Sequence, residues 1–196
     1  MPRGIAIPQL RQHLFSAAET VVLREGPAKL SGRAVTVEAG VATGIIYTHF
    51  ADFDGFLAAY AVDRSFTIAA APAFAERLGT GKVAANLADG LAAVPGPALT
   101  ALARLLATRP ELTARVEEVL GAGGSGIDAL ERAAAEYLAA EQVAGRLGAA
   151  AEPGALALAA VSVLHRLVLA GATDLDRLRS AVAALIAGAA GRTAPR

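Results

Sequence analysis

Residues 31–50 read SGRAVTVEAGVATGIIYTHF, and two short helical patterns flank a glycine in this stretch. Ser31 can cap the first helix by accepting a hydrogen bond from a free backbone N–H. Val35 and Ala39 then recur on one face at helical spacing. Gly40 can adopt a positive φ without steric cost, so it ends the first helix and permits a sharp turn. This arrangement is typical of a helix-turn-helix.

The second helix of the pair is expected over residues 42–49, and its two sides differ in chemistry. Ile46 and Phe50 stand four residues apart on the side that faces the core. When a helix-turn-helix docks on DNA, its second helix enters the major groove with the N-terminal residues at the base edges. Gly44 has no side chain and would allow close approach of the backbone. The side opposite the core is therefore the predicted DNA-binding face.

That face combines hydroxyl and imidazole groups with small residues. Tyr47 and His49 can donate hydrogen bonds to phosphates, which positions a protein on DNA without reading its sequence. Changes at Thr43 or Thr48 are expected to alter which bases are preferred. The candidate DNA-binding residues are Ser31, Arg33, Ala42, Thr43, Gly44, Ile45, Tyr47, Thr48 and His49.

At these residues the chain resembles the TetR family of bacterial repressors. The family's recognition segment runs alanine, glycine, valine, serine, any residue, glycine, any residue, an aliphatic residue, tyrosine, any residue, histidine, phenylalanine, and residues 39–50 here read AGVATGIIYTHF. Residues 14–26, LFSAAETVVLREG, are similar to the family's first helix, with Gly26 as its stop. The resemblance implies an all-α protein with two domains. Residues 1–52 would form a three-helix DNA-binding domain of the helix-turn-helix type, and residues 53–196 a helical domain for effector binding and dimerisation.

Two departures from the family pattern bear on DNA affinity. The family usually has serine where this chain has Ala42, and losing such a cap typically costs about 0.5–2 kcal/mol unless Thr43 replaces it. The family also usually opens its fourth helix with lysine and glutamate, where this chain has Phe53 and Asp54. Asp52 can still cap that helix. With one phosphate-facing cation missing, a shallower salt dependence of DNA binding is expected than in relatives.

Composition excludes several kinds of site. The 196 residues contain no cysteine, which excludes disulfides and thiolate metal sites. Formal net charge is zero, although residues 1–50 carry five basic and three acidic side chains, a local net of +2. Such a modest basic patch does not indicate nucleic-acid binding without the motif. The N-terminus shows no secretory signal pattern, so a cytoplasmic location is expected. Neither a metal nor a cofactor is expected.

Beyond residue 50, long alanine- and leucine-rich helical patterns alternate with breakers, and no strand pattern appears. Prolines 72, 95, 97, 110 and 153 fall at the expected joints. The last residues, RTAPR, are expected to form a loose tail. The predicted helices are Phe53–Ala70, Lys82–Val94, Ala98–Ala107, Glu111–Leu120, Ile127–Arg146, Gly154–Gly171 and Asp174–Gly188.

Two local patterns invite other interpretations. Gly121, Gly123 and Gly126 match the spacing of a dinucleotide-binding fingerprint, but that fingerprint follows a strand, and the preceding ELTARVEEVL is helical in pattern. Residues 154–172 are long and apolar enough to span a membrane. His165 and Arg166 lie within this segment, however, and an arginine inside a spanning helix costs about 2.5–3.5 kcal/mol. We therefore interpret the glycine-rich segment as a connector and residues 154–172 as a buried helix. No membrane partner is expected.

An enzyme should leave recognisable groups of catalytic residues, and the sequence lacks them. His13, His49 and His165 are scattered, and no serine lies in a nucleophile-elbow setting. Glu117 and Glu118 are adjacent and so point to different sides of their helix. The sequence therefore does not predict an enzyme.

The family resemblance implies an effector cavity among the middle helices, over residues 53–120. Few charges lie in this region, so the expected effector is a neutral or amphipathic organic molecule. Phe56 and Tyr60 stand four apart and could equally be core residues. Arg104, Asn86 and Tyr60 are possible polar anchors. The candidate effector-binding residues are Tyr60, Phe66, Phe74, Asn86, Leu87, Leu91, Leu102, Leu105 and Leu106.

The same resemblance implies a homodimer in which the last two long helices form a four-helix bundle with a second subunit. Small residues would let the subunits approach closely, and leucines and valines would fill the seam. His165 is expected to be a hydrogen-bonded packing residue there rather than a metal ligand. The candidate interface residues are Leu156, Ala160, Val163, Leu164, Leu167 and Leu185.

These patterns favour a ligand-responsive transcriptional regulator, most simply a repressor, which binds a palindromic operator as a homodimer and is released by a small, mostly apolar effector. The alternative is a helical protein that binds or sequesters small molecules and whose DNA-binding domain is weakened. Zero net charge, Ala42 and Phe53 motivate this alternative. Selection of genomic DNA fragments distinguishes the two.

Overall fold

The computed structural model describes residues 7–171 and 174–190. Every regular element within these residues is helical, and no β-strand occurs among them, so the predicted all-α fold is confirmed. The predicted RTAPR tail lies outside the described residues. The elements are α1 (Ile7–Glu25), the 3-10 helix η1 (Pro27–Lys29), α2 (Gly32–Glu38), α3 (Ile45–His49), α4 (Phe53–Ala70), α5 (Phe74–Arg77), α6 (Val83–Ala92), α7 (Gly96–Thr108), α8 (Glu111–Leu120), α9 (Gly126–Val143), α10 (Pro153–Leu169) and α11 (Leu175–Ala190).

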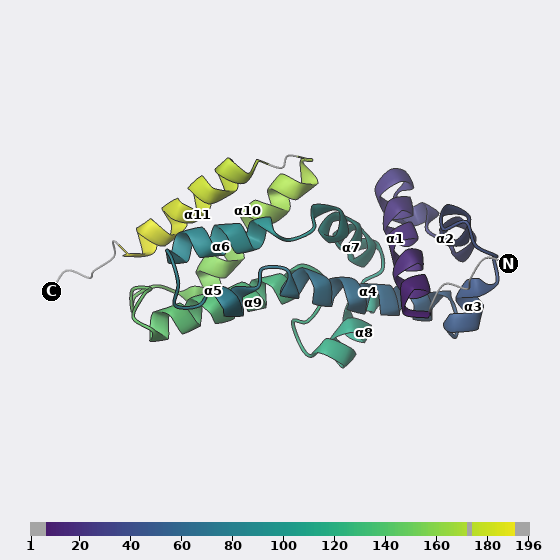
Figure 1. Cartoon of the computed structure of the whole chain (residues 1–196), viewed down its shortest axis with the longest axis horizontal. Helices are drawn as coiled ribbons and strands as arrows, with labels where there is room; N and C mark the ends of the chain where they lie inside the picture. Colours follow the sequence, from purple (N-terminus) through teal and green to yellow (C-terminus); the bar gives the residue numbers. More distant parts are fainter. Residues whose placement is uncertain (1–6, 172–173, 191–196) are drawn as a thin grey trace.

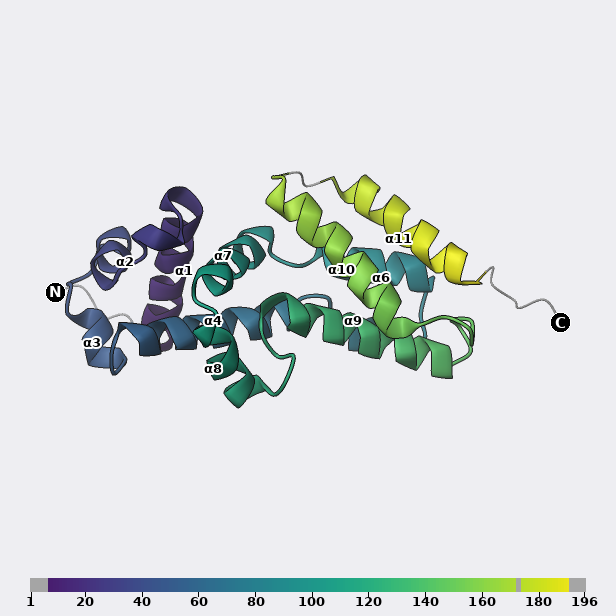
Figure 2. The ribbon, with the colours of Figure 1, turned by 180° about the vertical axis from the view of Figure 1, so that it is seen from behind.

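The molecule is elongated, and its first three helices form a compact group at one end, called the head below (Figure 1). Helix α4 leads from the head into the body, where it packs on α7, α8 and α9. Helix α10 packs on α9, and α11 packs on α6 and α10. Seen from behind, α10 and α11 lie toward the end of the molecule away from α3 (Figure 2). Helix α3 and the C-terminal end of α11 therefore lie at opposite ends of the molecule.

The predicted helix positions agree closely with the structure. Helices α4 and α8 have the predicted bounds, and α6, α9, α10 and α11 differ from them by one to three residues at their ends. Helix α7 begins at Gly96, earlier than predicted, because Pro97 is tolerated in a first turn where its missing N–H is not needed. The short helix α5 was not predicted, since four residues are too few to show a helical period.

An aromatic cluster joins the head to α4. The ring of Phe15 lies 5.6 Å from that of Phe56 and 5.8 Å from that of Tyr60, and Phe50 meets Phe56 edge-on at 5.1 Å. Phe56 and Tyr60 are fully buried. Of the two interpretations open for these residues, the structure therefore supports core packing. The packed core continues across residue 52, so the head cannot move independently of the start of α4.

A buried ionic network also ties α1 to α4. The Arg64 guanidinium donates to Glu19 at 3.0 Å, to Asp63 at 2.6 Å and to the Gln12 amide oxygen at 3.2 Å. Its carbon also lies 5.5 Å from the centre of the Tyr60 ring. The side chain of Arg64 is only 10% exposed, so these charges interact with little screening by water. The network orients the head on the body.

At the far end of α9, Glu141 forms a second buried ion pair. Its side chain is fully buried and accepts hydrogen bonds from Arg146 Nε at 2.6 Å and from the Gly79 N–H at 3.2 Å. Arg146 also donates to the Thr80 and Gly81 carbonyl oxygens. Burial by itself would raise the pKa of the Glu141 carboxyl, but the hydrogen bond from Arg146 and the Gly79 amide outweigh burial and lower the pKa. The pair holds the loop between α5 and α6 against α9.

Replacing Glu141 with Gln should lower the free energy of unfolding at pH 7 by about 2–3 kcal/mol, because Arg146 would lose its buried partner. The lowered pKa means that this stabilisation is complete above the ordinary value of 4.5 and is lost as the pH falls below it. Urea unfolding between pH 7 and pH 3 should therefore show a smaller loss of stability for Glu141→Gln than for the parent. The control is Glu136→Gln, at an exposed position. Equal losses in parent and variant would contradict the prediction.

Among the described residues, no single helix is long and apolar enough to cross a membrane. Helices α6 and α7 are long and apolar enough only when taken together, and the chain bends by 73° between them. The glycine-rich segment 121–126 follows helix α8, not a strand, as the sequence predicted. Its last N–H, that of Gly126, donates to the buried Ser65 hydroxyl on α4 at 2.8 Å. The segment is therefore a structural connector.

Candidate functional site

The turn between α2 and α3 has the predicted construction. The Ser31 side chain accepts a hydrogen bond from the Ala34 N–H at 3.2 Å and so caps α2. Gly40 adopts φ +66°. Its N–H donates to the Val37 carbonyl at 3.1 Å, and the next N–H donates to the Thr36 carbonyl at 3.0 Å. This pair of bonds is the Schellman motif, which ends a helix and fixes the direction of the following chain.

Helix α3 is shorter than predicted, because it begins at Ile45 rather than Ala42. Ala42 has no side-chain oxygen with which to cap the helix, and no side-chain cap replaces it, so Thr43 does not take over that role. The first turn closes instead through a hydrogen bond from the Ile45 N–H to the Ala42 carbonyl at 3.0 Å. The regular helix therefore starts three residues later than predicted.

The predicted DNA-binding residues nevertheless form one exposed face at the end of the molecule. Tyr47 is 60% exposed, and Ile45 and His49 are half-buried. Ile46 is fully buried, and Phe50 packs in the aromatic cluster, as predicted for the core side. The remaining members of the set are all exposed: Ser31, Arg33, Ala42, Thr43, Gly44 and Thr48.

The electrostatics of the head are weaker than its composition indicates. Arg24 lies 2.8 Å from Glu38 and 2.8 Å from Glu25, so its charge is already compensated. Within residues 7–171 and 174–190, neither Lys29 nor Arg33 forms an ion pair, and both are exposed. Lys29 precedes α2 and Arg33 lies in its first turn, and both remain available for phosphates.

Residues at the start of α4 are used for packing and not for contact with phosphate. The ring of Phe53 stacks on that of Phe56 with centroids 5.7 Å apart. Asp54 forms an ion pair with Arg109 at 3.0 Å. Asp52 caps the helix by accepting from the Gly55 N–H at 2.6 Å, as predicted. Phe53 thus takes part in the aromatic cluster that joins the head to α4.

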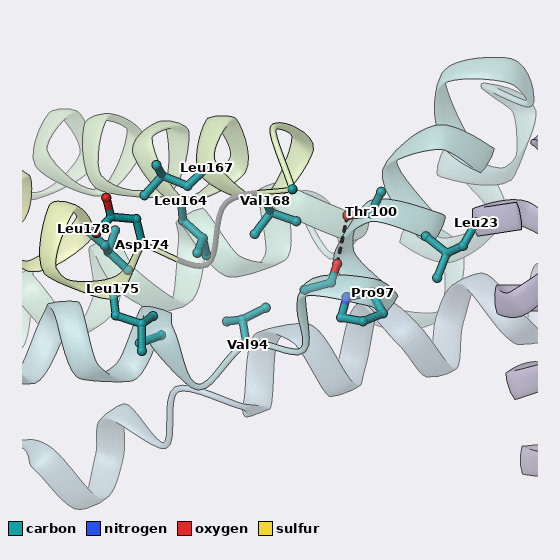
Figure 3. Close-up of a pocket in the computed structure, with 13 residues that line it drawn as sticks. Leu23, Val94, Pro97, Thr100, Leu164, Leu167, Val168, Asp174, Leu175 and Leu178 are labelled. Carbon is teal, nitrogen blue, oxygen red and sulfur yellow. Dashed lines mark hydrogen bonds between the residues drawn. The ribbon is translucent and has the colours of Figure 1, made fainter.

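A cavity of about 330 Å³ lies where α10 and α11 meet the elbow between α6 and α7 (Figure 3). Leucine and valine side chains from the elbow and from both late helices line it, and Leu23 of α1 completes the lining. The Thr100 hydroxyl donates to the Gly96 carbonyl at 2.9 Å. Asp174 accepts from the Arg177 N–H at 2.9 Å. The lining residues are Leu23, Ala92, Val94, Gly96, Pro97, Thr100, Leu164, Leu167, Val168, Gly171, Asp174, Leu175 and Leu178.

The nine predicted effector-binding residues do not line this cavity, and the structure does not bring them into one site. Phe66 is 65% exposed on the surface of α4. Phe74 stacks on Tyr137 with centroids 4.9 Å apart, and Asn86 donates to the Arg77 and Thr80 carbonyls. The others fill the core: Tyr60, Leu87, Leu91, Leu102 and Leu105 are fully buried, and Leu106 is half-buried.

Sequence reasoning missed the cavity because its walls come from five separate segments. Arg104, predicted as a polar anchor, instead donates to the Leu23 carbonyl at 3.4 Å. A local signal did exist in the Pro95–Pro97 elbow, since two prolines so close together force α6 and α7 apart. Nothing in the sequence indicates that α10 and α11 pack beside this elbow.

Most of the predicted interface residues on α10 are packed inside the single chain. Leu156, Ala160, Leu164 and Leu167 are buried within the single chain, where α10 packs on α9 and α11. Val163 and Leu185 are half-buried. The sequence pattern of α10 does not distinguish the side that faces the core from the outward side, because both sides carry apolar residues.

The outward face of α10 carries apolar side chains together with polar ones. Leu158 and Leu169 of α10 are 54% and 49% exposed. Ser162 and the charged Arg166 are exposed at helical spacing between them, and the exposed residues in the second half of α11 are small: Ala183, Ala184, Ala187 and Gly188. His165 also lies on α10, half-buried. Its Nε2 has no hydrogen-bond partner among the described residues, contrary to the expectation of a hydrogen-bonded histidine.

Solved structures with this arrangement of helices are numerous, although no family profile and no curated protein matches the chain. A putative TetR-family transcriptional regulator from Rhodococcus sp. superposes with a TM-score of 0.69 at 18% identity, over 90% of this chain and 97% of that one. Salmonella enterica GusR gives 0.69 at 16% identity, over 95% and 96%. The transcriptional regulator FadR from Bacillus subtilis in complex with stearoyl-CoA gives 0.63 at 15% identity, over 90% and 98%. The chain therefore has the fold of the TetR-family transcriptional regulators.

Proposed function

We propose that the protein is a ligand-responsive transcriptional regulator, acting as a repressor, that binds a palindromic operator as a homodimer and is released by a small, mostly apolar effector. The observation that carries this proposal is the exposed face of residues 42–48, presented by a capped helix, a Schellman turn and a buried Ile46. The fold shared with known regulators supports it. The neighbour in complex with stearoyl-CoA supports an effector-binding body.

In this proposal residues 1–52 bind DNA, residues 53–196 bind the effector and the second subunit, and the protein acts in the cytoplasm without catalysing a reaction. Thr43 and Thr48 approach base edges, while Tyr47, His49, Ser31 and Arg33 contact phosphates. Thr48 Oγ1 donates to the Gly44 carbonyl at 3.2 Å, so its lone pairs remain free to accept from a base. The absence of a cation at Phe53 and the pairing of Arg24 should make the salt dependence of binding shallow, because each missing phosphate contact removes about 0.9 from the slope.

The experiment that tests the proposal is selection of genomic DNA fragments by the purified full-length protein at physiological salt. Enrichment of one inverted-repeat sequence, with half-sites about one helical turn apart, is the expected result. Uniform recovery of all fragments would overturn the proposal. Uniform recovery together with tight binding of small molecules would establish the alternative, a sequestering protein with a weakened head.

We assign the subunit interface to the outward face of α10 and α11 defined by Leu158, Ser162, Leu169 and Ala184. Replacing Leu158 with Glu should shift the protein to monomers by burying a charge in the interface, raising the dimer dissociation constant at least about a hundredfold. Analytical ultracentrifugation measures this shift. Val143→Glu is the matched control, because Val143 is 91% exposed and lies at the end of α9, not on α10 or α11. A parent that sediments as a monomer would contradict the assignment.

A further inference from the structure

The cavity of Figure 3 has the size and position of a site for a small molecule. Its volume of about 330 Å³ lies at the lower end of the range for small-ligand pockets. Leu164, Leu167, Leu178 and Val94 are each at least nine-tenths buried and turn apolar atoms toward the space. Empty apolar space of this kind lacks dispersion contacts, which an apolar occupant would restore.

The polar groups of the cavity are hydrogen-bond acceptors. Thr100 is 8% exposed, and its hydroxyl proton is committed to the Gly96 carbonyl, so the oxygen can only accept from an occupant. The Asp174 carboxylate, at the rim, accepts one N–H and keeps further lone pairs. Lysine and arginine are absent from the described lining. An anionic group placed here would meet like charge and find no cation.

The N-termini of the two helices that begin beside the cavity do not make it a binding site for anions. At the start of α11, Asp174 already supplies the negative charge that a helix N-terminus favours. At the start of α7, Pro97 occupies the first turn and removes one of the N–H groups that could bind an anion. Both features lower the affinity of the cavity for carboxylates and phosphates.

The cavity also contacts the head. Leu23 lies in the last turns of α1 and lines the cavity, and its carbonyl accepts from Arg104 of α7. The opposite walls belong to α10 and α11. An occupant would therefore touch a helix of the head and the two late helices at once. It can shift the position of the head only if it binds one head position more tightly than another.

We infer that this cavity binds a small, largely apolar molecule that carries a hydrogen-bond donor, hydroxyl or amine, and no negative charge. The assignment of the cavity as the effector site rests on the proposed regulator function. The inferred chemistry of the ligand does not depend on that function. It places the site at the α6–α7 elbow, away from the nine residues expected from the sequence. The ligand donor binds the Thr100 oxygen or Asp174, and the apolar part fills the space between the leucines.

The test uses three probes of the same shape: 4-phenylbutan-1-ol, 4-phenylbutylamine and 4-phenylbutyrate. Calorimetry and thermal unfolding of the full-length protein without DNA report binding, so the result does not depend on an operator. The alcohol and the amine should bind at least tenfold more tightly than the carboxylate. Equal or tighter binding of the carboxylate would overturn the ligand class, and failure of all three to bind would overturn the site.

Two variants locate the binding. Ala92→Phe fills the cavity from its wall and should abolish binding of the alcohol, whereas Ala93→Phe, at the neighbouring exposed position, should leave it unchanged. Thr100→Val keeps the shape of the side chain and removes the acceptor, so it should weaken the alcohol at least fivefold while leaving butylbenzene unaffected. Unchanged alcohol binding in both Ala92→Phe and Thr100→Val would overturn the assignment. Release of a selected operator by the alcohol then tests the effector role separately.

Discussion

Replacing Gly44 with Ala should weaken DNA binding at least about tenfold while leaving the fold intact. Gly44 is exposed with φ −76° and ψ −8°, a backbone conformation that alanine adopts readily. A Cβ built at this position meets no atom within 4 Å. Alanine should therefore be neutral or should stabilise the free protein by about 0.4–1 kcal/mol, through the lower entropy of its unfolded chain. Any large loss of DNA affinity must then come from the contact with DNA.

The expected loss of affinity is at least about tenfold, or 1.4 kcal/mol, because the added methyl group prevents close approach of the backbone to the groove. Fluorescence anisotropy with the selected operator measures it, and urea unfolding verifies the fold. Gly148→Ala serves as the control, since Gly148 is also exposed and also has no atom within 4 Å of its built Cβ. Parent affinity in Gly44→Ala would show that α3 does not approach DNA closely.

Replacing Arg64 with Met should produce the largest loss of stability. The substitution keeps most of the apolar stem but leaves Glu19 and Asp63 without their buried partner. Breaking a buried ion pair costs about 3–5 kcal/mol. The lower value, about 3 kcal/mol, is expected here because the Asp63 side chain is 26% exposed. Denaturant unfolding measures the change. The head should also lose its orientation on α4, because the hydrogen bonds from Arg64 to Glu19 and Gln12 join α4 to α1.

Two further variants separate this effect from a general loss of charge. Arg132→Met removes an exposed partner of Glu136, 4.0 Å away, and should change stability by less than about 0.5 kcal/mol. Adding Glu19→Gln and Asp63→Asn to Arg64→Met removes the two uncompensated carboxylates and should restore part of the lost stability. A triple variant less stable than Arg64→Met would contradict the explanation in terms of buried unpaired charge.

The sequence predicted the helix-turn-helix in detail because its features are local. The Ser31 cap, the positive φ of Gly40 and the burial of Ile46 each depend on neighbours within a few residues. The one local error, the start of α3, has a local cause as well: Ala42 cannot cap, and the sequence indicated this weakness without indicating how many residues the helix would lose.

Packing between distant segments was not predictable in the same way. Helix α10 is apolar on more than one side, so its pattern could not show that Leu164 and Leu167 face the chain's own core and cavity while Leu158 faces outward. The predicted effector-binding residues are ambiguous for a related reason. Leu87, Leu91 and Leu102 are apolar whether they fill a core or surround a ligand, and in this protein they fill the core.

The amino-acid order alone determined that the chain is helical, where most of its helices lie, and which turn presents a hydroxyl-bearing face at one end, because capping, periodicity and glycine conformation act over short stretches of chain. The tertiary structure decided which side of each late helix is inward, which cations are compensated, and that space remains at the α6–α7 elbow. Those outcomes depend on how side chains from separate segments fit together, and a one-dimensional pattern of apolar residues does not specify that fit.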